Sequence, residues 1–179
     1  MKKIYLISGK AQSGKDSTAN FLKEKLDGKS LIIHNADYLK YMAKEYMGWD
    51  GEKGEVGRGI LQFLGTEKVR IGLKKPLFWV EKTCDVIDIL ENEFDYFLVP
   101  DTRFLNEIYL PKARFPNCVS SIRINRLNFD NGLTKSQKNH PSETGLDNFN
   151  FDYYINSESG LDNLEIEIEK ILNILKEDK

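Results

Sequence analysis

Seven residues near the start of the chain, GKAQSGK at positions 9–15, have the types and spacing that bind a phosphate group. Glycines at positions 9 and 14 let the backbone curl so that successive N–H groups point at one anion, and the helix that follows adds its dipole. The lysine supplies a positive charge for the β- and γ-phosphates of a nucleotide. We therefore predict a phosphate-binding loop formed by Gly9, Lys10, Ala11, Gln12, Ser13, Gly14 and Lys15.

The residue after Lys15 departs from the usual pattern of such loops. That position normally holds Ser or Thr, whose hydroxyl binds magnesium, and here it holds Asp16, followed by Ser17. A carboxylate is itself a good oxygen ligand for Mg²⁺, either directly or through water. We predict that Asp16 binds the metal. The alternative is that Asp16 only caps the helix, where a negative charge is favourable, while Ser17 serves the metal.

A second pair of charged residues, Asp101 and Arg103, follows the apolar run at 96–99. Enzymes with a phosphate loop place an acid that organises magnesium after such a strand, so we predict this role for Asp101, with a helix cap as the alternative. Pro100 stands where a plainer apolar residue is expected, which leaves the local backbone geometry open. Arg103 is predicted to clamp a phosphate; a salt bridge to Glu107, four residues later, is the competing interpretation.

Four polar residues recur at every fourth position between residues 58 and 70: Arg58, Gln62, Thr66 and Arg70. On a helix this spacing gives one face with two arginines. Such a face suits a phosphate monoester dianion, or a nucleobase that is recognised by hydrogen bonds to a side-chain amide. A solvated helix face is the alternative. Trp79, further along the chain, either stacks on a base or belongs to the core.

The chain as a whole resembles a known family, the deoxynucleoside monophosphate kinases of the bacteriophage type, which are related to phosphomevalonate kinases. The aspartate after the lysine of the loop is a trait of that family. Further segments resemble the family in the same order along the chain. They are ADYLK at 36–40, RGILQFLGTEKVR at 58–70, PLFWV at 76–80, PDTRFLNE at 100–107, HPSETGLDNF at 140–149 and YYINSESGLDNL at 153–164.

The resemblance implies an ATP-dependent kinase that requires Mg²⁺ and phosphorylates deoxynucleoside monophosphates. It implies that Asp37 and Lys40 lie on the acceptor side, where Asp37 helps the acceptor phosphate or its metal. A lone Asp that opens a helix is otherwise more often a cap. The resemblance also places Glu107, which closes the Asp-x-Arg-x-x-x-Glu signature, with the acceptor.

The same resemblance implies a mobile lid over residues 125–145. Arg123 and Arg126 lead into this polar segment, and in such kinases arginines of this region meet the nucleotide and the transferring phosphoryl group. His140 and Glu143 belong to the lid or the cleft by resemblance only, since a lone His in a loop is otherwise usually exposed.

Composition limits the partners of the protein. The 179 residues carry 26 Lys and Arg against 28 Asp and Glu, so the net charge is −2 and a basic nucleic-acid surface is not expected. No apolar run is long enough for a signal peptide or a spanning helix. Cys84 and Cys118 lie far apart without metal-ligand spacing, which indicates reduced thiols and a cytoplasmic protein without zinc. Small-molecule substrates, no membrane and a possible homodimer are expected.

Short apolar runs alternate with helical patterns along the chain, which predicts an open α/β fold with a parallel sheet of about five strands. We expect a three-layer sandwich of the P-loop NTPase class in a single domain, residues 1–179, with an acceptor-binding helical region at about 37–92. Strands are predicted at 4–8, 31–34, 96–99, 119–124 and 153–155. Helices are predicted after Lys15 and at 37–47, 60–73, 77–90, 104–115 and 161–175, and a mobile glycine-rich loop at 48–59. Ligands of such sheets bind at the carboxyl ends of the strands.

Two other classes of protein use the same loop. A GTPase switch needs the strings Asn-Lys-x-Asp and Asp-x-x-Gly, and neither occurs in this sequence. A binding module without turnover is disfavoured because Lys15, Asp16, Asp101 and several arginines are all present. Within the kinases, phosphomevalonate is the alternative acceptor.

Overall fold

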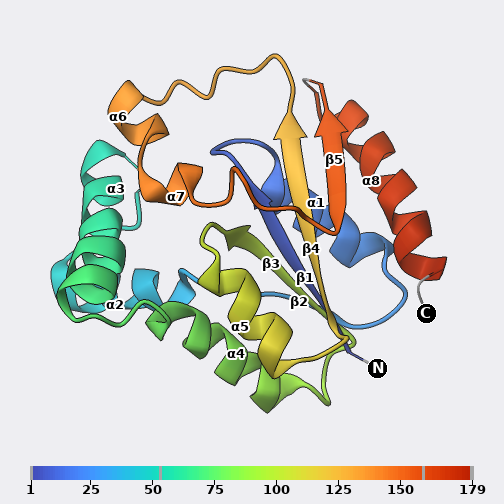
Figure 1. Cartoon of the computed structure of the whole chain (residues 1–179), viewed down its shortest axis with the longest axis horizontal. Coiled ribbons are helices and arrows are strands. Elements are labelled where there is room, and N and C mark those ends of the chain that lie inside the picture. The colour runs from blue at the N-terminus through green and yellow to red at the C-terminus, as the bar shows by residue number, and fades with distance from the viewer. Residues whose placement is uncertain (1, 53, 159, 178–179) are drawn as a thin grey trace.

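The core of the protein is a five-stranded parallel sheet with the strand order β2-β3-β1-β4-β5 (Figure 1). The computed structural model describes residues 2–52, 54–158 and 160–177. The strands are β1 (Lys3–Gly9), β2 (Ser30–Ile32), β3 (Tyr96–Thr102), β4 (Val119–Arg126) and β5 (Tyr153–Ser157). Every neighbouring pair is parallel, so the predicted open α/β fold is confirmed.

Helices cover both faces of the sheet because the central strand is apolar on both sides. Along β1, Tyr5 and Ile7 pack with α1 (Lys15–Lys25) and α8 (Leu161–Glu177) on one face. Ile4 and Leu6 point the other way and pack with α4 (Phe78–Leu90) and α5 (Asn106–Arg114). This alternation is the two-residue period of a strand, and it produces the predicted three layers.

A third apolar cluster lies beyond the edge of the sheet, where α2 (Asp37–Met47), α3 (Glu55–Gln62) and the π-helix η1 (Phe63–Gly72) pack together. The single helix predicted at 60–73 is formed by the end of α3 and by η1. In Figure 1 these helices project to one side of the sheet, below the segment that carries α6 and α7.

The loop predicted at 48–59 is wrong from Glu55 onward, where α3 begins. Trp49 donates its ring N–H to the carbonyl of Glu52 at 2.9 Å, and this turn packs directly on Gly57. A Cβ at Gly57 would lie 2.0 Å from the Glu52 oxygen, so the glycine is needed for close packing and not for flexibility.

The polar segment after β4 contains two short helices, α6 (Lys135–Lys138) and α7 (Pro141–Thr144). Thr134 and Gln137 form a reciprocal capping box that starts α6. The segment crosses from the end of β4 toward α3 and returns to β5 (Figure 1).

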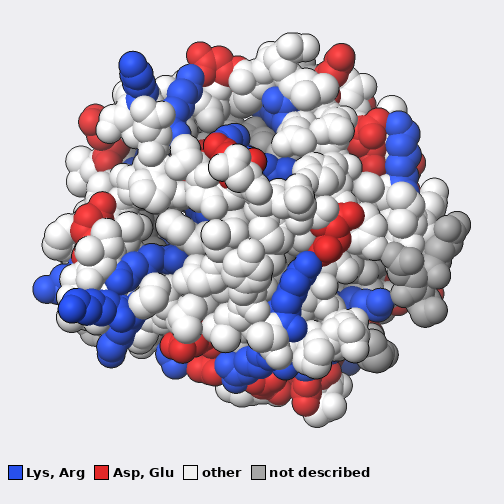
Figure 2. Space-filling view, in the orientation of Figure 1, with Lys and Arg blue, Asp and Glu red and all other residues white. Residues whose placement is uncertain are grey.

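Charged side chains of both signs are scattered over the face shown in Figure 2. No helix among the described residues is long and apolar enough to cross a membrane.

Candidate functional site

The carboxyl ends of three strands meet at one cavity of about 440 Å³, which we call the larger cavity. Lys15 and Asp16 reach it from the loop after β1, His34 and Asn35 from the turn after β2, and Asp101 from the end of β3. These residues lie far apart in the sequence and come together because parallel strands end at the same edge of the sheet.

The loop at 9–15 has the backbone that its glycines predict. Gly14 has a φ of +98°, which a residue with a side chain rarely adopts, and it directly precedes α1. A Cβ at Gly9 would lie 2.3 Å from the Ser13 hydroxyl and 2.8 Å from the Ile124 carbonyl oxygen. The loop is therefore wound too tightly for a side chain at position 9.

Lys15 is buried at the centre of the loop. Its ammonium group donates to the carbonyl oxygens of Gly9 at 2.9 Å and Lys10 at 2.7 Å. Burial and the nearby Arg103 guanidinium lower the pKa of Lys15 to about 8. An anion bound in the loop would favour the protonated amine, so the site is prepared for a phosphate group.

Asp16 and Asp37 lie on either side of His34, which the sequence analysis did not select. The imidazole nitrogens of His34 are each 3.4 Å from one of these carboxylates. Hydrogen bonds to Asp16 and Asp37 raise the pKa of His34 to about 9. Burial favours a higher pKa for Asp37, but its bonds with His34 prevail and lower that pKa to about 2. The position of His34 two residues before the segment ADYLK, at the end of the predicted second strand, was a signal that could have identified it.

Asp101 holds the turn between β2 and α2. One carboxylate oxygen accepts from the backbone N–H of Asn35 at 2.8 Å, and the other accepts from that of Ala36 at 3.0 Å. The helix cap considered in the sequence analysis is not formed, because α5 begins at Asn106 and Asp101 instead holds the turn that leads into α2. Each carboxylate oxygen can accept more than one hydrogen bond, so these bonds leave capacity for a ligand.

Asp16 and Asp101 offer hard oxygen donors at the same cavity as Lys15. No group of three or more His, Cys, Asp and Glu side chains able to hold a metal occurs in the described part of the chain. Mg²⁺ is usually held by one or two carboxylates together with phosphates and water. The donor set therefore fits magnesium that enters with a nucleotide.

Arg103 pairs with Glu143, not with Glu107. Its guanidinium lies 2.5 Å from a Glu143 carboxylate oxygen, while its backbone N–H donates to Glu107 at 2.7 Å. The other carboxylate oxygen of Glu143 accepts from the backbone N–H of Ala11 at 2.9 Å. The predicted alternative of an Arg103–Glu107 salt bridge is wrong. A buried carboxylate from α7 instead contacts both the phosphate loop and Arg103.

Lys10 adds two further contacts between the loop and the segment after β4. Its ammonium group donates to the carbonyl oxygen of Glu143 at 2.6 Å and to a carboxylate oxygen of Asp147 at 2.7 Å. The segment is therefore docked against the loop in this structure.

Glu107 is buried and holds Arg70. The guanidinium of Arg70 lies 2.6 Å from one carboxylate oxygen and packs over the ring of Phe104 at 4.0 Å. Burial raises the pKa of Glu107, and the charge of Arg70 opposes this rise. The pair fixes the orientation of Arg70 at the wall of the larger cavity.

The predicted polar face on α3 and η1 lines the larger cavity, together with Lys40, Glu107, His140 and Glu143. The four residues of that face are Arg58, Gln62, Thr66 and Arg70. Trp79 also borders the cavity, but it is only 1% exposed and donates its ring N–H to the Gly65 carbonyl at 3.0 Å. Trp79 is therefore part of the core wall.

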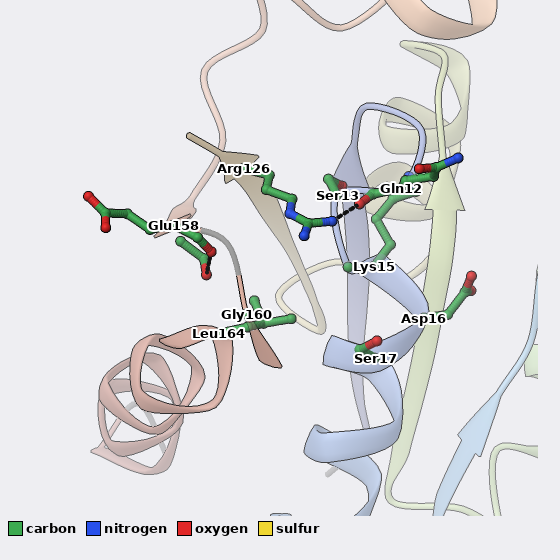
Figure 3. Close-up of a pocket in the computed structure, with 11 residues that line it drawn as sticks. Gln12, Ser13, Lys15, Asp16, Ser17, Arg126, Glu158, Gly160 and Leu164 are labelled. Atoms are coloured by element: carbon green, nitrogen blue, oxygen red, sulfur yellow. Dashed lines mark hydrogen bonds between the residues drawn. The ribbon is translucent and has the colours of Figure 1, made fainter. Parts of the chain in front are cut away.

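A smaller cavity of about 370 Å³ lies on the other side of the loop, between the start of α1 and the start of α8 (Figure 3). Arg126 reaches it from the end of β4, donates to the Gln12 carbonyl at 3.0 Å and packs over Phe129 at 3.7 Å. Four lining residues were missed: Ser157, Glu158, Gly160 and Leu164. They belong to the recognised segment YYINSESGLDNL, which was a usable signal.

Four predicted site residues border neither cavity: Gly9, Lys10, Asp37 and Arg123. The guanidinium of Arg123 is buried and donates to the Ser8 hydroxyl at 3.1 Å and to Asp147 at 3.2 Å. Its contacts join β4 to β1 and to the segment after α7.

The two cavities meet at the loop, because Gln12, Lys15 and Asp16 line both. Figure 3 shows Asp16 directed away from Arg126 and Leu164, which lie across the smaller cavity. Two ligands, one in each cavity, would therefore approach each other at Lys15.

Comparisons with known proteins place this geometry in context. No protein-family model matches the chain. A deoxynucleotide monophosphate kinase of Escherichia phage RB69 is 30% identical over 116 residues, which are 64% of this chain and 44% of that protein. A deoxynucleotide monophosphate kinase of Enterobacteria phage T4 is 27% identical over 119 residues, 66% of this chain and 46% of that protein. The chain thus matches slightly less than half the length of these relatives.

Among solved structures, the APS kinase of Mycobacterium tuberculosis in complex with AMPPNP and APS has a similar fold. Its TM-score is 0.59 at 12% identity, and the match covers 98% of both chains. The fold is therefore that of P-loop kinases, as predicted. The sequence resemblance to phage deoxynucleotide monophosphate kinases is confirmed as well.

Proposed function

We propose that the protein catalyses the transfer of the γ-phosphoryl group of ATP to a deoxynucleoside monophosphate, which yields ADP and the deoxynucleoside diphosphate. The observation that carries this proposal is the meeting of two cavities at Lys15, Asp16 and Gln12. A transfer between two bound nucleotides needs such a junction, because the reacting phosphates must be held in line and close together.

The smaller cavity receives the donor. The N–H groups of the loop and the start of α1 bind the phosphates of ATP, and the base lies toward Leu164 and Gly160 at the start of α8. Lys15 neutralises negative charge on the β- and γ-phosphates. Arg126, at the rim, contacts the phosphates or the base.

The larger cavity receives the acceptor. Arg70 and Arg58 supply positive charge for the monophosphate, and Arg70 is already oriented by Glu107 at 2.6 Å. Gln62 and Thr66 lie on the same face and supply polar groups toward the base or the sugar. A preoriented arginine loses less entropy when it binds phosphate, so it is well suited to fix the acceptor.

Magnesium would be held by Asp16 and Asp101 together with the phosphates. When bound, it would neutralise charge on the β- and γ-phosphate oxygens. Ser17, which lines the smaller cavity, is the other candidate ligand from the loop.

The reaction requires little covalent chemistry from the protein. An oxygen of the acceptor phosphate attacks the γ-phosphorus, the bond from that phosphorus to the β-γ bridging oxygen breaks, and ADP leaves with the electron pair. No side chain has to remove a proton, because the attacking phosphate oxygen is already anionic. Arg103 stabilises the transferring group once ATP displaces Glu143 from it, and the lid at 125–145 excludes water that would otherwise hydrolyse ATP.

The names of the two phage relatives support this choice of acceptor, since both are deoxynucleotide monophosphate kinases. The P-loop kinase fold supports phosphoryl transfer in general. The partners of the protein in this proposal are small molecules, ATP and the monophosphate.

A coupled assay of ADP release tests the proposal. The protein is incubated with ATP and Mg²⁺ and with dAMP, dCMP, dGMP, dTMP or phosphomevalonate in turn, and Lys15→Ala serves as the inactive control. ADP release that depends on at least one deoxynucleoside monophosphate is the expected result. ADP release only with phosphomevalonate would mean that phosphomevalonate is the acceptor. If no acceptor increases ADP release, the protein is a binding module without turnover.

A further inference from the structure

Asn35 lies at the junction of the catalytic elements and has no role in the site described above. It is three residues beyond the end of β2, lines the larger cavity, and is 5% exposed. Its backbone N–H donates to Asp101 at 2.8 Å, and its neighbour His34 contacts Asp16. Asn35 is therefore at the phosphate end of the cavity, near the residues that surround Lys15.

The amide nitrogen of Asn35 is not used by the fold. This nitrogen is buried and has no hydrogen-bond partner among the residues that the structure describes. A buried donor without a partner destabilises a folded protein, and buried polar groups almost always have one. An unpaired donor at the wall of a binding cavity indicates a partner that arrives with the ligand.

The surroundings of Asn35 indicate which atom of the ligand accepts the hydrogen bond from its amide. The cationic side chains of the cavity are largely paired with carboxylates, as in Arg70–Glu107 and Arg103–Glu143. A neutral amide can donate to a phosphate oxygen without first breaking an ion pair. Asn35 lines the larger cavity, which receives the acceptor in the proposed function, and does not line the smaller one. Its backbone bond to Asp101, a proposed magnesium ligand, puts its amide on the acceptor side at the end where the phosphates react.

We propose that Asn35 is an acceptor-binding residue whose side-chain amide donates a hydrogen bond to the phosphate of the nucleoside monophosphate. The proposal rests on the function proposed above. The bond orients the oxygen that attacks the γ-phosphorus, and it gives the buried amide the partner that it lacks in the unliganded protein.

The variant Asn35→Ala separates this role from a structural one. The backbone N–H that holds Asp101 remains in the variant, and the side chain with its unpaired amide nitrogen is lost. We expect the KM for the monophosphate to rise about tenfold, which corresponds to about 1.4 kcal/mol, because a hydrogen bond to a charged group is lost. The KM for ATP stays unchanged, and the Tm of the unliganded variant stays within about 3 °C of the parent or rises above it.

Ser30→Ala is the matched control. Ser30 begins β2, at the opposite end from Asn35, is 9% exposed, and also carries a buried hydroxyl without a partner among the described residues. Its loss should leave both KM values unchanged. Asn35→Asp is a second test, because it nearly keeps the shape but cannot donate and repels a phosphate. It should raise the acceptor KM more than Asn35→Ala does.

An acceptor KM within threefold of the parent in Asn35→Ala would overturn the proposal. A rise in both KM values with a Tm lowered by more than about 3 °C would overturn it too, because the amide would then serve the fold. Calorimetric titration with each of the four deoxynucleoside monophosphates provides a readout without turnover. A parent that neither binds nor phosphorylates any of them contradicts the proposed function itself, whereas an active parent with an equally active variant contradicts only the role of Asn35.

Discussion

Replacement of Arg70 by alanine would test the acceptor side of the site. It should also lower the stability of the fold, by an amount that follows from the structure. Glu107 is 2% exposed, and its carboxylate lies 2.6 Å from the Arg70 guanidinium. Removing one partner of a buried ion pair costs about 3–5 kcal/mol. Glu107 keeps the backbone N–H groups of Arg103 at 2.7 Å and Phe104 at 3.1 Å, so we expect the lower end of that range. A loss of about 3 kcal/mol lowers the Tm by roughly 6–12 °C for a chain of this size.

The loss of stability in Arg70→Ala should depend on pH. Burial already raises the pKa of Glu107, and the loss of the arginine raises it further. A carboxyl group whose pKa is higher in the folded than in the unfolded protein binds more protons when folded, so its contribution to stability falls as the pH rises. The stability lost in Arg70→Ala should therefore be small below the ordinary pKa of glutamate, near 4.5. The loss should grow as the pH rises from there through the raised pKa of Glu107. Thermal unfolding between pH 4.5 and 8 measures it.

Kinetics of the same variant test the proposed role. If Arg70 grips the acceptor phosphate in ground and transition states alike, the KM for the monophosphate rises while the KM for ATP does not. The double variant Arg70→Ala/Glu107→Gln is the control, because it removes the unpaired charge and should recover part of the stability but none of the acceptor affinity. A Tm loss that is independent of pH would refute the reasoning about Glu107. A higher KM for ATP alone would mean that the two sides of the cleft are assigned the wrong way round.

Four further variants test the loop and its neighbours. Lys15→Ala should abolish transfer in a folded protein, and activity within threefold of the parent at saturating ATP would contradict its role. Because the pKa of Lys15 is about 8, the affinity of the parent for ATP should fall between pH 7 and 9 in calorimetric titrations. Asp16→Asn and Asp101→Asn should each raise the Mg²⁺ concentration needed for half-maximal activity. An unchanged Mg²⁺ titration of Asp16→Asn would indicate that Asp16 only caps the helix. Asp101→Asn should also cost about 1 kcal/mol through weakened hydrogen bonds to the turn before α2. Glu143→Gln removes a negative charge 2.9 Å from the Ala11 N–H, so ATP should bind roughly tenfold more tightly; weaker binding would mean that Glu143 supports the nucleotide.

The docking of Glu143 suggests how the unliganded site remains ordered. Its carboxylate accepts hydrogen bonds from a loop N–H and from Arg103, which are groups suited to a phosphate. The buried side chain therefore satisfies donors that would otherwise lack an acceptor. The same contacts join α7 to the loop, so in the proposed function displacement of Glu143 by a nucleotide would release the segment at 125–145 from the loop.

The sequence by itself determined the features that depend on local geometry. The glycine spacing at 9 and 14 specifies the backbone conformation of the loop, and the short continuous apolar run before it specifies a strand that is buried on both faces. Both are found in the structure. The order of strands and helices likewise predicted the parallel sheet and the convergence of strand ends. The four-residue spacing of Arg58, Gln62, Thr66 and Arg70 predicted one face, which lines the larger cavity.

Only the tertiary structure decided which charges pair. The spacing of Arg103 and Glu107 favoured a helical salt bridge, but α5 begins at Asn106, so Arg103 precedes the helix and the rule for neighbouring turns does not apply. The actual pairs, Arg70–Glu107 and Arg103–Glu143, join residues 37 and 40 positions apart. Such contacts depend on how separate elements pack. The unpaired amide of Asn35 and the meeting of two cavities at Lys15 have the same origin, because burial and enclosure exist only once the helices cover the sheet.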